Sequence, residues 1–149
     1  MKTAFCFDLD GTVTTTEVLP CIASALQVSD EIATLTKATM DGHIPFEASF
    51  RLRCLILSVV PIDTVKSIVA TIPLEESILT FIQEHKEDCF IVTGNLKIWI
   101  QPIVEKCGCH CYSSEAMLHD GHLELQKILN KADAIQAIRQ LGYERIIAV

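Results

Sequence analysis

The stretch TAFCFDLDGT, residues 3–12, decides the fold. Residues 3–8 are a short apolar run rich in β-forming side chains and Gly11 marks a turn, so we expect a buried strand there. Similar runs occur at residues 89–94, 109–117 and 145–149. Helical patterns separate these runs, and strands that alternate with helices predict a parallel sheet covered on both faces. The expected fold class is therefore α/β.

The segment between the first two expected strands is too long for a single crossover, and its pattern is helical. Helices are expected at about 17–27, from a cap at Ser29 to Gly42, from Pro45 to 58, from Pro61 onward and at about 75–86. We therefore expect a helical cap at residues 15–73, inserted into an α/β core of residues 1–14 and 74–149. Further helices are expected at 96–107 and 131–141, and the turn at 119–122 indicates a hairpin or a loop.

Length and composition restrict the class of protein. The 149 residues suit one domain with an insertion, and half of them are hydrophobic. The formal net charge of -7 argues against nucleic acid or an anionic membrane as the main partner. No apolar run has the length of a signal peptide or a membrane span. The seven cysteines are an odd number in largely apolar contexts, so we expect reduced thiols and a cytoplasmic protein.

Asp8 and Asp10 are the strongest candidates for catalysis. In an extended chain, residues two apart point to the same side, and two such carboxylates would repel each other. Mg²⁺ removes this conflict, since it prefers one or two carboxylates together with phosphate oxygens and water. Asp8 can then act as a nucleophile on phosphorus, and Asp10 can exchange a proton with the leaving alcohol and with water. A calcium-binding EF-hand loop is excluded because Val13 and Leu19 stand where it needs glycine and glutamate.

Other candidates follow later strands. Thr93 and Gly94 end the second strand, where a hydroxyl and an N–H can bind a phosphate oxygen. Lys131 begins a helix after the third strand and can supply the cation that two carboxylates and a phosphate need; Lys127 is the backup. Cys107, Cys109 and Cys111 surround His110, but without a second ligand pair we interpret them as buried thiols rather than a zinc site.

Together these motifs resemble the haloacid dehalogenase superfamily. DLDGT near the N-terminus, VTG after a helical insertion, and NKADAI before IIAV follow its order of motifs. Glu17 and the segment MDGHIPFEASFRLR, residues 40–53, are similar to the phosphoserine phosphatases and their close relatives. The resemblance covers the whole chain and implies the superfamily's Rossmann-like core with a helical cap between strands one and two.

The resemblance also implies a role for each matching residue. Asp8 would be the nucleophile and Asp10 the general acid and base, with Mg²⁺ held by the Asp8 carboxylate and the Asp10 main-chain carbonyl. The phosphoryl group would be bound by Gly11, Thr12, Thr93, Gly94 and Lys131. Glu17 would receive a substrate ammonium, Arg53 a substrate carboxylate, and Phe46 would shield the site, which suits a small phosphorylated metabolite resembling phosphoserine.

Two positions depart from the phosphoserine phosphatase pattern. Those enzymes have Ser-Gly-Gly at the second motif, whereas this chain has Thr93, Gly94 and Asn95, which places an extra side chain where the substrate would approach. The family also places a Gly-Asp-Gly-x-x-Asp loop after the fourth strand. The sequence ends at Val149, so we expect a core without that loop, weaker Mg²⁺ binding and an exposed sheet edge, which would allow a homodimer.

The sequence therefore predicts a Mg²⁺-dependent phosphatase that acts through an aspartyl-phosphate. Two alternatives remain open: a catalytically impaired remnant that binds phosphate, and a phosphotransferase that passes the phosphoryl group to an acceptor other than water.

Overall fold

The computed structural model describes residues 1–149 and contains one five-stranded sheet. The strands are β1 (Thr3–Phe7), β2 (Cys89–Leu96), β3 (His110–His119), β4 (His122–Lys127) and β5 (Arg145–Ala148). Their order in the sheet is β4-β3-β2-β1-β5. All neighbours are parallel except β3 and β4, which form an antiparallel hairpin at one edge. This confirms the α/β class, and the turn at 119–122 is a hairpin.

The central strands are apolar on both faces. On β1, Phe7 belongs to a large hydrophobic cluster on one face, while Ala4 and Cys6 belong to a second cluster on the other face. On β2, Cys89 and Ile91 join the first cluster, and Phe90 and Val92 join the second. This period of two explains why the sequence of these strands is a continuous apolar run: each face is covered by helices.

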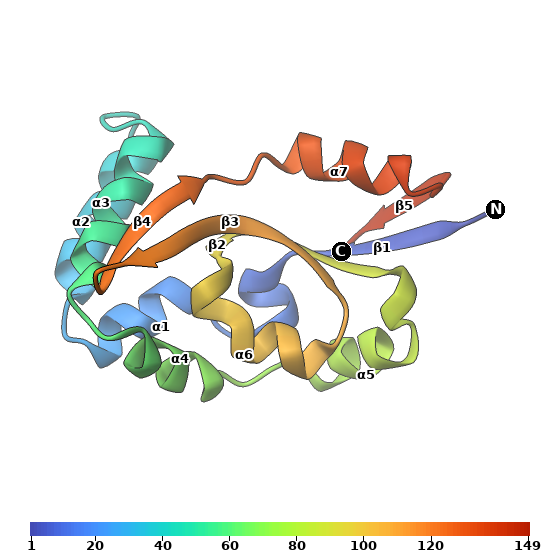
Figure 1. Ribbon diagram of the computed structural model, residues 1–149, viewed down its shortest axis with the longest axis horizontal. Helices are drawn as coiled ribbons and strands as arrows, with labels where there is room; N and C mark the ends of the chain where they lie inside the picture. The colour runs from blue at the N-terminus through green and yellow to red at the C-terminus, as the bar shows by residue number, and fades with distance from the viewer.

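The covering helices lie on opposite sides of the sheet (Figure 1). Helix α7 (Lys131–Gln140) packs on one face through Ala134 and Ile138. Helices α5 (Glu76–Glu84) and α6 (Lys97–Cys107) lie on the other face, where Ile82, Trp99 and Ile100 are fully buried. The result is a three-layer arrangement with the strands in the middle.

Residues 15–73 contain the helices α1 (Val18–Ala25), α2 (Ser29–Met40), α3 (Phe46–Ser58) and α4 (Ile62–Ala70). The two ends of this helical segment are tied together, because Thr14 and Leu74 form a β-bridge and the Thr15 N–H donates to the Pro73 carbonyl at 3.0 Å. Val18, Leu57 and Val65 of the segment share one hydrophobic cluster with the sheet. The four helices are therefore packed onto the α/β core at the same end as the carboxyl ends of the strands.

Some expected boundaries were wrong. Ser29 does not cap α2: it is the first residue of the helix, and Val28 occupies the capping position without a side-chain hydrogen bond. The expected helix at 75–86 ends at Glu84, and a short 3₁₀ turn at Lys86–Asp88 follows. The first strand ends at Phe7, so Asp8 lies just beyond it. No helix is both long and apolar enough to cross a membrane.

Candidate active site

The chain turns sharply after β1, and this turn carries the two candidate carboxylates. Residues Leu9–Val13 form a single wide turn closed by the Thr14 N–H, which donates to the Leu9 carbonyl at 3.0 Å. Gly11 has a φ of 73°, which favours glycine because a Cβ is disfavoured in the left-handed region. Its N–H donates to the hydroxyl of the fully buried Thr14 at 3.3 Å. No pattern in the sequence indicates Thr14, whose hydroxyl stabilises the turn by donating to the Leu9 carbonyl at 3.0 Å.

Asp8 presents its carboxylate at the end of β1, next to a cation. Oδ1 accepts the Leu9 N–H at 2.9 Å and lies 3.8 Å from Nζ of Lys131. The Asp8 side chain is 46% exposed and that of Lys131 is 63% exposed, so the pair is open to an incoming ligand. An exposed pair of this kind adds little to stability.

Asp10 reaches the same site through the turn rather than along an extended strand, which corrects the geometry expected from the sequence. Both of its oxygens are held. Oδ1 accepts the backbone N–H of Val18, the first residue of α1, at 2.8 Å. Oδ2 accepts from Nδ2 of Asn95 at 2.9 Å. The Asp10 carboxylate therefore links the first helix of the inserted segment to the end of β2.

Thr93, Gly94 and Asn95 lie near the end of β2, followed by Leu96 and then α6. Thr93 is buried, and its hydroxyl accepts both the Nδ2 group of Asn95 at 3.0 Å and the Asn95 backbone N–H at 3.2 Å. Asn95 is only 8% exposed, so its side chain is a fixed part of the site wall. These contacts orient Thr93 and Asp10 with respect to each other.

Lys131 owes its position to a capped helix. Asn130 precedes α7, and its Oδ1 accepts the N–H groups of Ala132 at 2.9 Å and Asp133 at 3.2 Å. This is a regular N-cap, and it fixes Lys131 as the first residue of the helix. Lys127, the backup cation, lies at the end of β4 and does not line the site.

One cleft of about 430 Å³ brings most of the expected site residues together. Those that line it are Asp8, Asp10, Glu17, Phe46, Arg53, Thr93, Gly94, Asn95 and Lys131. Gly11 and Thr12 do not line the cleft, and the Gly11 N–H already donates to the Thr14 hydroxyl. Five further residues line the cleft without having been expected from the sequence: Leu19, Pro20, Ile32, Thr36 and Phe50.

The sequence of the chain, including all of these site residues, matches the model of one protein family over nearly its whole length. The family of haloacid dehalogenase-like hydrolases matches residues 5–149. The chain belongs to this family.

Relatives of known function within the haloacid dehalogenase family include several phosphoserine phosphatases. The protein of that name from Methanocaldococcus jannaschii is 30% identical over 126 residues, which are 82% of this chain and 60% of the relative. The human phosphoserine phosphatase is 26% identical over 108 residues, 69% of this chain and 48% of the relative. The chain thus spans 60% or less of the length of these relatives.

Solved structures of the family share the fold. A haloacid dehalogenase family hydrolase from Salmonella enterica serovar Typhi superposes with a TM-score of 0.86 at 25% identity, over 98% of this chain and 55% of that one. A substrate-bound phosphoserine phosphatase gives a TM-score of 0.78 at 26% identity, over 99% of this chain and 76% of that one.

Part of the cleft wall is formed by α3. Phe46 is half exposed and stacks on Phe50 with ring centroids 5.9 Å apart. One turn further, Nε of Arg53 is buried without a hydrogen-bond partner, and burial lowers the pKa of the Arg53 guanidinium from its ordinary value. Arg53 also lines the cleft, where a guanidinium can bind an acceptor.

The donor set suits Mg²⁺ in one respect. Asp8 Oδ2 makes no hydrogen bond within the chain, so a hard carboxylate oxygen is free in the cleft. Cys107, Cys109, Cys111 and His110 are not grouped as metal ligands, because no three His, Cys, Asp or Glu side chains lie close enough together to hold a metal ion. Burial raises the pKa of the Cys107 and Cys111 thiols to about 11 and, helped by neighbouring thiols, that of Cys109 to about 12.

Proposed function

We propose that this protein is a Mg²⁺-dependent phosphatase that hydrolyses a small phosphomonoester through an aspartyl-phosphate on Asp8. The observation that carries the proposal is the convergence of Asp8, Lys131, Thr93 and the doubly held Asp10 on one cleft. Membership of a hydrolase family and similarity to phosphoserine phosphatases support the same reaction class.

In the first step, an Asp8 oxygen attacks phosphorus while the bond from phosphorus to the leaving oxygen breaks. Lys131, 3.8 Å from Asp8, offsets negative charge on the carboxylate and on the phosphoryl oxygens. The Thr93 hydroxyl can turn toward a phosphoryl oxygen and donate to it. Asp10 gives a proton to the leaving oxygen, so the alcohol departs neutral.

In the second step, water attacks the aspartyl-phosphate. Asp10, now ionised, takes a proton from this water, the bond between phosphorus and Asp8 breaks, and inorganic phosphate is released. The two N–H donors on Asp10 keep its carboxylate near the reacting oxygen during both steps. Asp8 and the main-chain carbonyl of Asp10 would hold Mg²⁺, which when bound neutralises phosphate charge and polarises the phosphoryl group.

The walls of the cleft favour a substrate with groups of both charges. Glu17 and Arg53 line the same cleft and carry opposite charges, so an ammonium and a carboxylate on one small molecule would each find a partner. Phe46 and Phe50 add an apolar wall. An amino-acid phosphate such as phosphoserine satisfies these requirements.

The test is Mg²⁺-dependent release of phosphate from a panel of phosphomonoesters that includes phosphoserine, for the wild type and Asp8→Asn. Turnover by the wild type that is lost in Asp8→Asn and on chelation of the metal would support the proposal. Thermal stabilisation by inorganic phosphate without any turnover would replace it with the phosphate-binding alternative. Phosphorylated alcohols among the products, when alcohols are added as acceptors, would indicate a phosphotransferase.

A further inference from the structure

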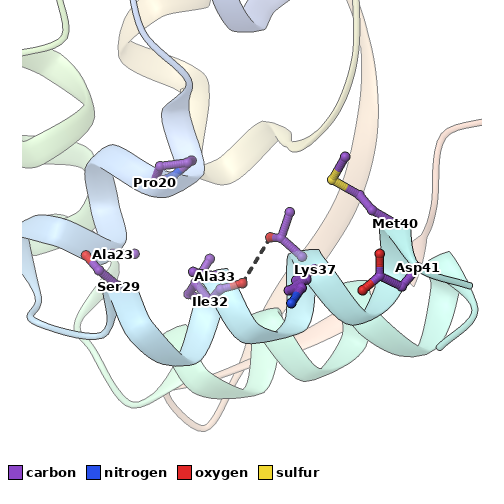
Figure 2. Close-up of a pocket in the computed structure, with 9 residues that line it drawn as sticks. Pro20, Ala23, Ser29, Ile32, Ala33, Lys37, Met40 and Asp41 are labelled. Atoms are coloured by element: carbon purple, nitrogen blue, oxygen red, sulfur yellow. Dashed lines mark hydrogen bonds between the residues drawn. The ribbon is translucent and has the colours of Figure 1, made fainter. Parts of the chain in front are cut away.

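A second hollow lies between α1 and α2, beside the catalytic cleft (Figure 2). Its volume is about 450 Å³, within the range of small-molecule sites. We call it the α1–α2 groove. Its walls are Pro20, Ala23, Ser29, Ile32, Ala33, Thr36, Lys37, Met40 and Asp41. Figure 2 shows Pro20 on α1 facing the α2 side chains across the groove.

The groove and the catalytic cleft share walls. Pro20, Ile32 and Thr36 line both of them. Ile32 and Thr36 are one turn apart on α2, so they face the same side of that helix. These three residues therefore form the boundary between the cleft and the groove, and a molecule with its phosphate near Lys131 would reach the groove by extending across them.

The surface of the groove is mostly carbon. Pro20 and Ala33 expose apolar side chains to it, Ala23 and Ile32 lie buried beneath, and the Thr36 hydroxyl donates to the Ile32 carbonyl at 2.9 Å. Met40 is 83% exposed at one end, where it covers no other part of the chain. From Ile32 to Met40 the helix rises about 12 Å, which gives the groove room for several methylene groups.

We propose that the α1–α2 groove binds the apolar part of the substrate's leaving group. Besides the small charged substrates that fit the cleft, the protein would then accept phosphomonoesters whose alcohol carries an alkyl segment, with the phosphate at Asp8 and the alkyl segment beside Pro20 and Ala33. Lys37 and Asp41 lie beside Met40 and can meet a polar end group (Figure 2). The inference rests on the proposed phosphatase function, and it adds where the apolar part of the leaving group would bind.

The decisive experiment compares n-alkyl phosphates from methyl to hexyl. Each methylene that enters the groove is expected to raise kcat/KM about twofold to fourfold, because burial of a methylene is favourable. Ala33→Trp places a large side chain inside the groove from an exposed position that does not line the cleft. This variant should lose the gain with chain length while turnover of methyl phosphate and phosphoserine is unchanged.

Thr34→Trp is the matched control, since Thr34 is the next residue of α2, is also exposed, and does not line the groove. It should keep the chain-length dependence of the wild type. A kcat/KM that stays constant from methyl to hexyl, or the same loss in both tryptophan variants, would overturn the inference.

A second experiment distinguishes failure of the groove inference from failure of the phosphatase proposal. Non-hydrolysable n-alkylphosphonates can be titrated into the Mg²⁺-supplemented protein, with thermal stabilisation as the readout. If no phosphomonoester is hydrolysed, the phosphatase proposal fails. The titrations still show whether the groove binds an alkyl segment. Affinity that rises with chain length in the wild type but not in Ala33→Trp supports the groove, and affinity independent of chain length rejects it.

Discussion

Nδ2 of Asn95 donates a hydrogen bond to Oδ2 of Asp10 across 2.9 Å and so joins residues 85 positions apart in the chain. The other oxygen of Asp10 accepts the backbone N–H of Val18 at 2.8 Å, at the start of α1. Nδ2 of Asn95 also donates to Thr93 at 3.0 Å. Asp10 is therefore held between the end of β2 and the inserted helices, and Asn95 connects the proposed proton-transfer group of Asp10 with the hydroxyl of Thr93, the proposed phosphate ligand.

Asn95→Ala should impair the reaction in a way that depends on the leaving group. Loss of the amide frees Asp10 to rotate, so proton delivery to a poor leaving group should slow, and kcat/KM should fall by about tenfold to a hundredfold. A good leaving group such as p-nitrophenolate departs without a proton, so its kcat/KM, which reports formation of the aspartyl-phosphate and not its hydrolysis, should change by less than about threefold. Parallel kinetics with an alkyl phosphate and p-nitrophenyl phosphate measure the difference.

Asp10→Asn provides the control for Asn95, because it removes the proton donor itself and should show the same preference for p-nitrophenyl phosphate. The double variant should be no slower than Asp10→Asn, since residues that act through one another are not additive. An equal loss with both substrates, or an effect confined to KM, would mean that Asn95 does not position Asp10.

Lys131→Ala should separate catalysis from stability. The ion pair with Asp8 is exposed and 3.8 Å long, so we expect its loss to change the free energy of unfolding by less than about 1 kcal/mol. The same change removes the cation beside the reacting phosphoryl group, and kcat/KM should fall by about a hundredfold to a thousandfold. Urea denaturation and steady-state kinetics on the same preparation test both parts.

Lys127→Ala is the matched control for Lys131, because this lysine is exposed, lies at the end of β4 and does not line the cleft. It should leave kcat/KM within about twofold, which is the ordinary range for a surface change. If the two lysine variants lost activity equally, the assignment of Lys131 to the phosphoryl group would be refuted.

The site residues that could be predicted from the sequence lie at the ends of strands or at the start of a helix. Asp8 and Thr93 come at the carboxyl ends of apolar runs, and parallel strands bring those ends to one edge of the sheet. Lys131 begins a helix behind a capping asparagine, which is also a local pattern. These features depend on neighbours in the sequence, so the residues could be named before the fold was seen.

The remaining features depend on packing. Pro20, Ile32 and Thr36 reach the cleft because α1 and α2 lie against each other, and no local pattern specifies that angle. Ser29 looked like a helix cap, but Gln27 adopts a φ of 61° and turns the chain so that Val28 takes the capping position. The N–H of Val18 that holds Asp10 belongs to the backbone and has no signature in the side chains.

Stability should fall in alkaline solution because of the buried thiols. Burial raises the pKa of Cys89 and Cys107 from 9.0 to about 11. The unfolded chain releases these protons near pH 9, whereas the folded chain keeps them until about pH 11. Their contribution to stability is therefore complete below pH 9 and is lost between pH 9 and about 11, by up to about 1.4 kcal/mol per thiol for each pH unit.

Denaturation in urea at intervals from pH 7.5 to 10.5, under reducing conditions, measures this decline. Cys107→Ala should make the decline shallower, because one raised thiol is gone. Val104→Ala, one turn earlier on α6, should lower stability at every pH without changing the slope, which makes it the control. A slope unaffected by Cys107→Ala would show that this thiol does not titrate differently in the folded protein.

The cap of α7 should couple stability to catalysis. Asn130 Oδ1 accepts two N–H groups of the first helical turn, at 2.9 and 3.2 Å, and Lys131 is the next residue. Asn130→Ala leaves both donors without their side-chain partner and should cost about 1 kcal/mol of stability. Because the first turn then frays, Lys131 is held less firmly beside Asp8, and kcat/KM should fall by less than in Lys131→Ala.

Asn130→Ser distinguishes the cap from other roles of the asparagine, since a serine hydroxyl caps a helix about as well and carries no charge. It should restore most of the stability and most of the activity lost in Asn130→Ala. If stability returned in the serine variant but activity did not, Asn130 would act on the phosphoryl site directly. If Asn130→Ala lost stability alone, the position of Lys131 would be set by the packing of Ala134 and Ile138 on the sheet rather than by the cap.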